Sequence, residues 1–250
     1  MKHSEVAIEA NERLDYFQRE DIHLIQSKAF FTSSLDAILL ADFTQLPVNK
    51  TFHYIDFCSG NGVIPLLLSA RTQATLQGIE IQAPLVDMAR RSAQLNGLAE
   101  RVEFLQMDLN DFKRPQDVLY DCVTCNPPYF LVEQSRETHQ LDSHAIARHE
   151  IYLTLEQWIQ KASQVMRSKG KLFFVHRPER LDQIFQTLLK YHFSIHRIRF
   201  VHPKVDRQAN TILVEAIYGG GLSGVKIEPP LVVHEANSEY TEEMKEIYYG

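Results

Sequence analysis

The tetrapeptide Asn126-Pro127-Pro128-Tyr129 has the residue types and spacing that best fit a chemical reaction in this chain. The side-chain oxygen of Asn126 and the backbone carbonyl of Pro127 can accept hydrogen bonds from both N–H bonds of an exocyclic or amide NH2 group. Such a nitrogen is a poor nucleophile because its lone pair is delocalised, and two acceptors favour the geometry that releases the lone pair. The prolines fix φ at about −65° and so preorganise the loop.

The ring of Tyr129 offers a flat face on which a base can stack. Asn126, Pro127 and Tyr129 are therefore predicted to be catalytic, in an in-line transfer of a methyl group from a sulfonium to the held nitrogen. A proline-rich turn that follows a strand and is capped by an asparagine is the alternative interpretation.

A second stretch, Asp56-Phe57-Cys58-Ser59-Gly60-Asn61-Gly62, follows an apolar run and precedes a helical pattern. Its glycines let backbone N–H groups approach a ligand where a side chain would collide. About 20 residues later an acid ends the next run and can accept from both ribose hydroxyls, and another acid ends the third run. Because ligands bind at the carboxyl ends of parallel strands, we predict a cofactor site formed by Asp56, Ser59, Gly60, Gly62, Glu80, Ile81, Asp108 and Asn126.

Two other interpretations of this loop exist. One is a plain tight turn. The other is a dinucleotide dehydrogenase, which uses a similar acid on the ribose, but its loop reads G-x-G-x-x-G. In this chain an acid precedes a shorter G-x-G and no third glycine opens the helix.

Apolar runs alternate with helical patterns along most of the chain, which predicts an α/β fold with a doubly wound, mostly parallel sheet of seven strands. The strands are expected at 53–58, 74–81, 102–108, 121–126, 171–176, 194–201 and 211–218. No helix separates the last two, so an antiparallel strand is expected near the C-terminus. A helix at 152–166 is expected to close at Lys169-Gly170, because glycine is typical of helix C-caps.

Three parts of the chain are expected. Residues 1–45 should form an N-terminal helical cap, residues 46–220 the main domain, and residues 221–250 a C-terminal extension packed on the same domain. A short strand is expected within that extension at 231–234.

The composition restricts the class of protein. Hydrophobic residues make up 44% and charged residues 23%, which argues against disorder. Apolar runs are too short for a membrane span, and the polar N-terminus lacks the apolar region of a signal peptide, so a soluble, cytoplasmic protein is expected. Three cysteines do not predict a disulfide framework, and no spacing among the eleven histidines is by itself sufficient to indicate a zinc site, so no metal is expected.

The net charge of −6 is unevenly distributed. Residues 161–210 hold eleven lysines and arginines against three acids, whereas the remainder is strongly acidic. A basic segment on an acidic body can steer a polyanion, and the alternative is a solvated surface with chance clustering.

These motifs together resemble the class I methyltransferases that use S-adenosylmethionine, and most of all the bacterial tRNA1(Val) adenine-37 N6-methyltransferase family. The resemblance runs from about residue 12 to residue 248. It is carried by the glycine loop, Ile79-Glu80-Ile81-Gln82, Asn126-Pro127-Pro128-Tyr129-Phe130, Ala145-Ile146-Ala147-Arg148-His149-Glu150 and His176-Arg177-Pro178-Glu179-Arg180-Leu181.

The resemblance implies a Rossmann-like fold, S-adenosylmethionine as cofactor and an adenine beside the anticodon of a valine tRNA as substrate. With the basic segment, it leads us to expect RNA contacts at Phe130, Arg148, Arg197, Arg199 and Lys204. One residue departs from the family pattern, because Cys58 stands where the family loop usually has glycine. If that position has a positive φ, cysteine costs on the order of 1 kcal/mol there.

Three rival functions remain open at this point. The tetrapeptide can hold a glutamine amide of a protein, although such an enzyme usually has a separate substrate domain and lacks a basic face. It can hold an exocyclic amine of rRNA. A catalytically silent RNA-binding or scaffold protein is the third rival, and the intact tetrapeptide argues against it.

Overall fold

The computed structural model describes residues 6–30, 35–46, 51–127, 153–222 and 224–250. Asn126 and Pro127 are therefore described, whereas the predictions for Tyr129, Phe130 and Arg148 fall outside the described residues.

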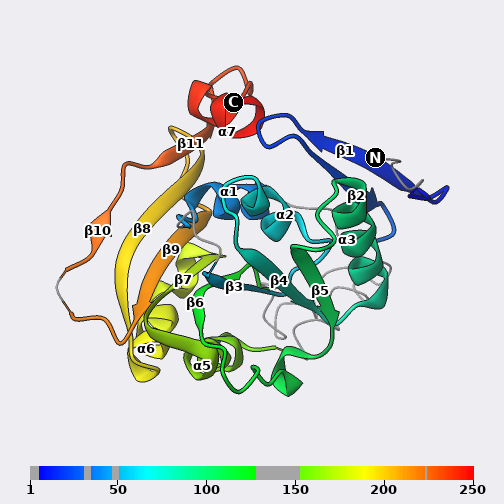
Figure 1. The fold of residues 1–250 in the computed structure, drawn as a ribbon. Coiled ribbons are helices and arrows are strands. Elements are labelled where there is room, and N and C mark those ends of the chain that lie inside the picture. The colour runs from blue at the N-terminus through cyan, green and yellow to red at the C-terminus, as the bar shows by residue number, and fades with distance from the viewer. Residues whose placement is uncertain (1–5, 31–34, 47–50, 128–152, 223) are drawn as a thin grey trace, which may run out of the picture.

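In the described part of the chain, nine strands form one twisted sheet (Figure 1). Its strands are, in spatial order, β10 (Lys226–Ile227), β8 (Phe193–Lys204), β9 (Thr211–Tyr218), β7 (Met166–His176), β6 (Tyr120–Cys125), β3 (His53–Phe57), β4 (Thr75–Glu80) and β5 (Val102–Gln106), and β11 (Leu231–His234) also pairs with β8. The pairs among β7, β6, β3, β4 and β5 are parallel, and β9 runs antiparallel between β7 and β8. The predicted α/β class, the mostly parallel sheet and the antiparallel strand are confirmed, and two short parallel edge strands extend the seven expected ones.

Helices cover both faces of the sheet. Successive residues of a central strand point to opposite faces, and both are buried. Phe173 of β7 belongs to a core cluster with α1 (Leu35–Phe43), α2 (Val63–Ser69) and α3 (Ala83–Leu95). Phe174 belongs to a second cluster with α5 (Leu155–Val165) and α6 (Leu181–Lys190). Trp158 of α5 packs edge-on against Phe174 at 5.1 Å between ring centroids.

The predicted helical cap is wrong for residues 12–27. These residues form an antiparallel hairpin of β1 (Glu12–Phe17) and β2 (Ile22–Ser27), and only α1 of the expected cap is helical. Asp21, in the turn, has a φ of 57°. Side chains at the C-terminal end of α3 bind the backbone of β2. The N–H of Ile25 donates to the Ser92 hydroxyl at 2.9 Å, and that of His23 donates to the side-chain oxygen of Asn96, the C-cap residue of α3, at 2.8 Å. Tertiary contacts of this kind are not visible in the local pattern.

The C-terminal helix α7 (Glu242–Tyr249) lies beside the hairpin, as Figure 1 shows. Arg19, in the hairpin turn, donates to the carbonyl of Ile247, and the side chains of Met244 and Ile247 are buried in the same core cluster as Phe17 and Leu24. In the described residues no helix combines the length and the apolar character needed to cross a membrane.

Candidate active site

The glycine loop and the residue after β6 meet at the carboxyl edge of the sheet. Strand β3 lies between β4 and β6, with Phe57 paired to both Ile79 and Cys125. The loop at 58–62 therefore begins next to Asn126, which follows Cys125 directly. Asn126 is half-buried and Pro127 is buried. The structure thus brings the two predicted acceptor groups beside the predicted cofactor loop.

Glycine is needed at two positions of this edge. Gly62 has a φ of 84° and is the N-cap residue of α2, and a Cβ there would collide with the ring of Phe104. A Cβ on Gly78 of β4 would lie 2.7 Å from the same ring and 2.8 Å from Ser59. The aromatic ring therefore packs directly against the backbone of the loop and of β4, which fixes the loop at the sheet edge.

Glu80 is hydrogen-bonded to the backbone of the glycine loop. It is 6% exposed, and its carboxylate accepts from the backbone N–H groups of Gly60 at 3.0 Å and Gln82 at 2.9 Å, one on each oxygen. A carboxylate has further lone pairs, so both oxygens retain acceptor capacity. Ile81 beside it is 38% exposed, and its apolar side chain provides a surface at the same edge.

Asp56 and Ser59 carry polar atoms that find no hydrogen-bond partner among the described residues. Oδ1 of Asp56 accepts from the Thr124 hydroxyl at 2.5 Å, but its Oδ2 and the Ser59 hydroxyl are buried without a hydrogen-bond partner. Burial raises the pKa of the Asp56 carboxyl well above its usual range, and the charge of Glu80 raises it further. An unpaired buried polar atom costs about 1–3 kcal/mol, so this site fits a ligand that brings hydrogen-bonding groups and a positive charge.

Asp108 lies beyond the end of β5. Its Oδ1 accepts from the N–H of Asn110 at 2.8 Å and so caps the short 3-10 helix η1 (Leu109–Asp111). The acids at the ends of three neighbouring strands are thus placed as the sequence predicts, with Asp56 buried, Glu80 bound to the loop and Asp108 at a helix start. No cluster of metal-binding side chains is present among the described residues.

His176 is a residue of this edge for which the sequence predicted no role. Cys125 pairs with Phe174, so the next residues along the two strands are Asn126-Pro127 and Val175-His176. His176 is 1% exposed, and its Nδ1 accepts from the N–H of Arg177 at 2.8 Å. Burial, with the charges of Arg180 and Arg177, lowers its pKa to about 3, so a neutral imidazole lies beside the tetrapeptide. Its only sequence signal was its place in a stretch that resembles the family.

Cys58 adopts the backbone conformation in which glycine is favoured. Its φ is 57°. The cysteine therefore stands at a position of positive φ, where the family pattern usually has glycine. The side chain packs against the apolar cluster on the α5 side of the sheet, next to Cys125, whose pKa is raised by burial and by the neighbouring Cys58 thiol. These contacts offset part of the backbone strain.

We expect Cys58→Gly to be about 1 kcal/mol more stable than Cys58→Ala, because alanine keeps the left-handed strain without the thiol contacts. Urea unfolding of both variants measures the difference. At a position with negative φ the alanine variant would be the more stable of the two, since glycine then only increases the entropy of the unfolded chain. An alanine variant as stable as the glycine variant would contradict the positive φ.

Arg197 does not belong to an RNA surface, so that prediction is wrong. Its guanidinium is 3.8 Å from the ring centroid of Phe43 and donates to Glu215 at 2.8 Å, Glu228 at 3.1 Å and the carbonyl of Phe43 at 2.8 Å. The residue is 7% exposed. Phe43 at the end of α1 covers the guanidinium, so Arg197 is a buried, neutralised charge and no phosphate can reach it.

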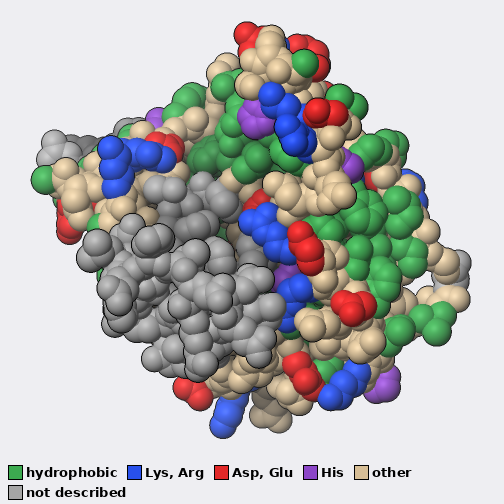
Figure 2. Space-filling view, turned by 180° about the vertical axis from the view of Figure 1, so that it is seen from behind, with side chains coloured by type: hydrophobic (Ala, Val, Ile, Leu, Met, Phe, Trp, Pro, Cys, Tyr) green, Lys and Arg blue, Asp and Glu red, His purple; other side chains and the backbone are tan. Residues whose placement is uncertain are grey.

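Arg199 and Lys204 hold the C-terminal extension. Arg199 donates to Glu243 at 2.5 Å and to the carbonyl of Pro229 at 3.0 Å, and Lys204 donates to Ser238 at 2.8 Å. Their RNA contacts remain predictions. On the face shown in Figure 2, Lys and Arg side chains stand next to Asp and Glu side chains and do not form one continuous patch.

Comparisons with known proteins agree with this architecture. The model of the methyltransferase small domain family matches residues 27–200. A tRNA1(Val) (adenine(37)-N6)-methyltransferase of Parabacteroides distasonis is 22% identical over 93% of this chain and 97% of its own length. An enzyme of the same name from Aeromonas hydrophila is 24% identical over 90% of this chain and 92% of its own.

Among solved structures, a predicted O-methyltransferase from Agrobacterium tumefaciens is similar, with a TM-score of 0.65 and 25% identity, over 86% of this chain and 95% of that chain. The sheet order, the glycine loop and the orphaned acceptors of the site agree with S-adenosylmethionine as the cofactor of such enzymes. The chain therefore belongs to the methyltransferase small domain family and is a methyltransferase that uses S-adenosylmethionine.

Proposed function

We propose that the chain methylates the exocyclic N6 of an adenine in tRNA, with adenine 37 of tRNA1(Val) as its target. The observation that carries the proposal is the position of Asn126 and Pro127 directly beyond β6, beside the loop that starts at Cys58. The curated relatives of nearly equal length that bear the tRNA1(Val) name support the choice of substrate.

The residues at the sheet edge fit the cofactor. S-adenosylmethionine supplies an electrophilic methyl group on a sulfonium, together with an ammonium, a ribose and an adenine. In the part of the chain that the structure describes, Oδ2 of Asp56 and the hydroxyl of Ser59 are buried without partners, and they would bind the polar groups of the methionine part. Glu80 would accept from the ribose hydroxyls, and Asp108 and Ile81 would hold the adenine.

The protein's part in the chemistry is to position the target amine. The side-chain oxygen of Asn126 and the carbonyl of Pro127 would accept from its two N–H bonds and direct its lone pair toward the methyl group. The amine becomes cationic and acidic once methylated, so its proton can leave after transfer. The low pKa of His176, about 3, agrees with this order of events, because an imidazole of that pKa is a weak base.

Methylation of separate RNA and protein fractions tests the proposal. A labelled methyl group from S-adenosylmethionine should be incorporated into an unmodified tRNA1(Val) transcript, and digestion should yield N6-methyladenosine. A transcript with guanine in place of adenine 37 is the matched control and should stay unlabelled. If the label appears in rRNA and not in tRNA, the chain is an rRNA methyltransferase. If it appears in a glutamine amide of a protein and not in tRNA, the chain is a protein methyltransferase.

We expect Glu80→Ala to weaken the binding of S-adenosylmethionine by about 1–3 kcal/mol, because hydrogen bonds to a charged acceptor are lost. Calorimetry with the purified protein measures the change. Glu103→Ala is the matched control, since Glu103 is an exposed acid on the neighbouring strand β5. Equal affinities of the two variants for S-adenosylmethionine would show that Glu80 does not bind the cofactor.

A further inference from the structure

Two thiols lie next to each other at the edge of the sheet that carries the glycine loop. Phe57 at the end of β3 pairs with Cys125 at the end of β6, and Cys58 is the residue after Phe57. Paired strands are about 4.8 Å apart and each residue adds about 3.3 Å along a strand, which places the Cα atoms of Cys58 and Cys125 about 6 Å apart. Disulfides form over Cα separations of roughly 4.4–6.8 Å, so this pair has a suitable spacing.

The left-handed backbone at Cys58 turns its side chain to the face on which Cys125 lies. Successive side chains of an extended strand alternate between the two faces, and Phe57 and Cys125 both belong to the apolar cluster on the α5 side. A strand continued through residue 58 would therefore direct the Cys58 side chain to the other face. With a φ of 57°, Cys58 packs against the same cluster as Cys125, and the two thiols share one face.

The two thiols differ in their access to solvent. Cys58 is partly exposed, whereas Cys125 is 0% exposed. Burial, together with the neighbouring Cys58 thiol, raises the pKa of Cys125 well above its usual value. Because the thiolate is the nucleophile, the buried Cys125 thiol is unreactive toward solutes. A reagent in solution therefore reacts with Cys58 first.

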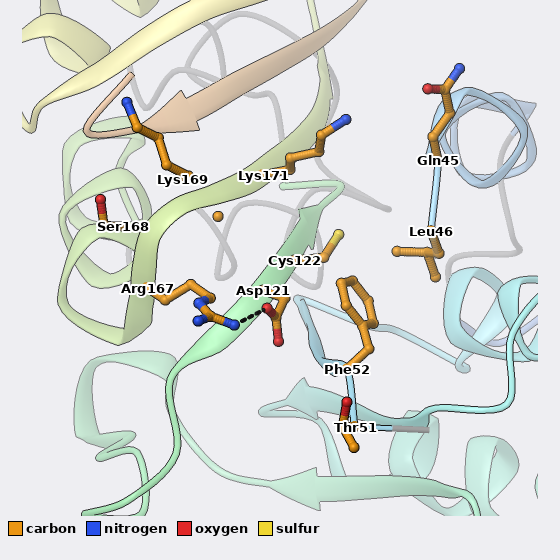
Figure 3. Close-up of a pocket in the computed structure, with 11 residues that line it drawn as sticks. Gln45, Leu46, Thr51, Phe52, Asp121, Cys122, Arg167, Ser168, Lys169 and Lys171 are labelled. Carbon is orange, nitrogen blue, oxygen red and sulfur yellow. Dashed lines mark hydrogen bonds and ion pairs between the residues drawn. The ribbon is translucent and has the colours of Figure 1, made fainter. Parts of the chain in front are cut away.

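The third cysteine of the chain lies on the other face of β6. Cys122 belongs to the core cluster that contains α1, α2 and α3, and it is 1% exposed. It borders a hollow at the amino-terminal edge of the sheet, and Figure 3 shows it there among lining residues such as Phe52 and Lys171. Cys122 is therefore a buried thiol of the same strand that cannot reach Cys58, which makes it a matched control.

We propose that Cys58 and Cys125 form a redox modification site, at which a peroxide closes a disulfide that weakens the binding of the cofactor. Neither Asn126 nor the target amine takes part in this modification. The proposal therefore goes beyond the methylation of tRNA and does not depend on it.

The oxidation occurs in two steps. The Cys58 sulfur loses its proton to solvent and attacks one oxygen of the peroxide, the O–O bond breaks, and the released hydroxide takes up a proton to give water. The resulting sulfenic acid condenses with a neighbouring thiol: the Cys125 sulfur attacks the Cys58 sulfur, the S–O bond breaks, and the leaving hydroxide takes the Cys125 proton. Each sulfur loses one electron, and the two oxygens of the peroxide gain both.

Closing the disulfide displaces the cofactor loop. Heavy atoms in contact are about 3.5–4.0 Å apart and bonded sulfurs about 2.05 Å, so the two sulfurs approach by about 1.5–2 Å. Cys125 is held inside the sheet, so Cys58 moves, and the N–H of Gly60 two residues later donates to Glu80 at 3.0 Å. A shift of the loop therefore disturbs Glu80, and we expect the affinity for the cofactor to fall about tenfold, the effect of one weakened hydrogen bond to a charged group.

Peptide mapping and calorimetry on the full chain test the site. After treatment with hydrogen peroxide, the protein should have a mass lower by two hydrogen atoms and should yield a peptide that links Cys58 to Cys125. Its affinity for S-adenosylhomocysteine should be about tenfold lower than that of the reduced protein. Dithiothreitol should remove the link and restore the affinity.

Three variants assign the effect to the pair, each compared with its own reduced form. Cys125→Ser should stop at the sulfenic acid of Cys58, which dimedone traps, and Cys58→Gly should form no disulfide. Both should keep their affinity for S-adenosylhomocysteine after peroxide treatment. Cys122→Ala should form the same disulfide as the wild type and lose the same affinity.

A wild-type protein in which Cys58 and Cys125 stay unlinked after peroxide treatment would overturn the site. An equal loss of affinity in oxidised Cys125→Ser and oxidised wild type would overturn the disulfide as its cause, and a linked protein of unchanged affinity would overturn its effect on the cofactor. Failure of the proposed function leaves all these results unchanged, because no RNA is used in them.

Discussion

Asn126→Ala should lower the single-turnover rate of methyl transfer to tRNA by about 10²–10³-fold, the effect of losing one preorganised polar contact to the transition state. The interaction with the target amine strengthens as its lone pair turns toward the methyl group, so the loss should appear in kcat more than in KM. Asn126 lies just after the end of β6 and is only half-buried, so the fold should change little, and the cofactor should still be held by the other residues predicted to bind it.

Asn237→Ala is the control for this experiment, because Asn237 lies in an exposed turn of the C-terminal extension. Its methyl-transfer rate should equal that of the wild type. A near-normal rate for Asn126→Ala would mean that the tetrapeptide is a structural turn. Equal losses in rate and in thermal stability would mean that Asn126 acts on the fold.

Arg197→Ala should destabilise the protein by about 3–5 kcal/mol, because removal of one partner leaves a buried charge uncompensated. Glu215 is 1% exposed and would keep only Lys171 as a cationic partner. Urea unfolding measures the loss. Arg13→Ala, which breaks an exposed ion pair with Asp15, should cost about 1 kcal/mol or less.

The double variant Arg197→Met/Glu215→Met should lose less stability than Arg197→Ala, since apolar replacement of a buried ion pair is often close to neutral. A double variant less stable than the single one would contradict the buried pair as the cause. The salt dependence of tRNA binding should be the same in Arg197→Ala and wild type, because a buried arginine contacts no phosphate.

The same pair gives a pH dependence of stability. Burial acts to raise the pKa of Glu215, but Lys171 and Arg197 outweigh it, so the net pKa is lowered. A carboxyl whose pKa is lower in the folded state stabilises the protein above its unfolded pKa. This contribution should be lost as the pH falls through the lowered folded pKa, and it should be absent from Glu215→Gln in urea unfolding at several pH values.

The sheet was predictable because its central strands are apolar runs that alternate along the chain with helical patterns. Residues 172–175 of β7 are all 0% exposed, and burial on both faces leaves a strong signal in the sequence. The predicted glycine loop was similarly local, since Gly60 and Gly62 both have positive φ. At Cys58 the sequence could predict strain only for the case of a positive φ, and the structure shows that φ is positive there.

The remaining features depend on contacts between distant segments. Lys169-Gly170 was interpreted as a helix end, but α5 ends at Val165 and the two residues belong to a bulge opposite Asp121. The N-terminal hairpin depends on pairing with α3. A count of charges could not tell that Arg197 is neutralised by Glu215, because the two residues meet only once β8 and β9 are paired.

The packing of the hairpin against α7 has a consequence for synthesis on the ribosome. The core around Phe17, Leu24 and Leu40 includes Met244 and Ile247, which are translated long after them. At about 5–20 residues per second, about 10–40 s separate the translation of α1 from that of α7. During this interval the apolar faces of the hairpin and α1 lack the cover that α7 provides, so the nascent chain presents a binding surface for chaperones until α7 has been translated.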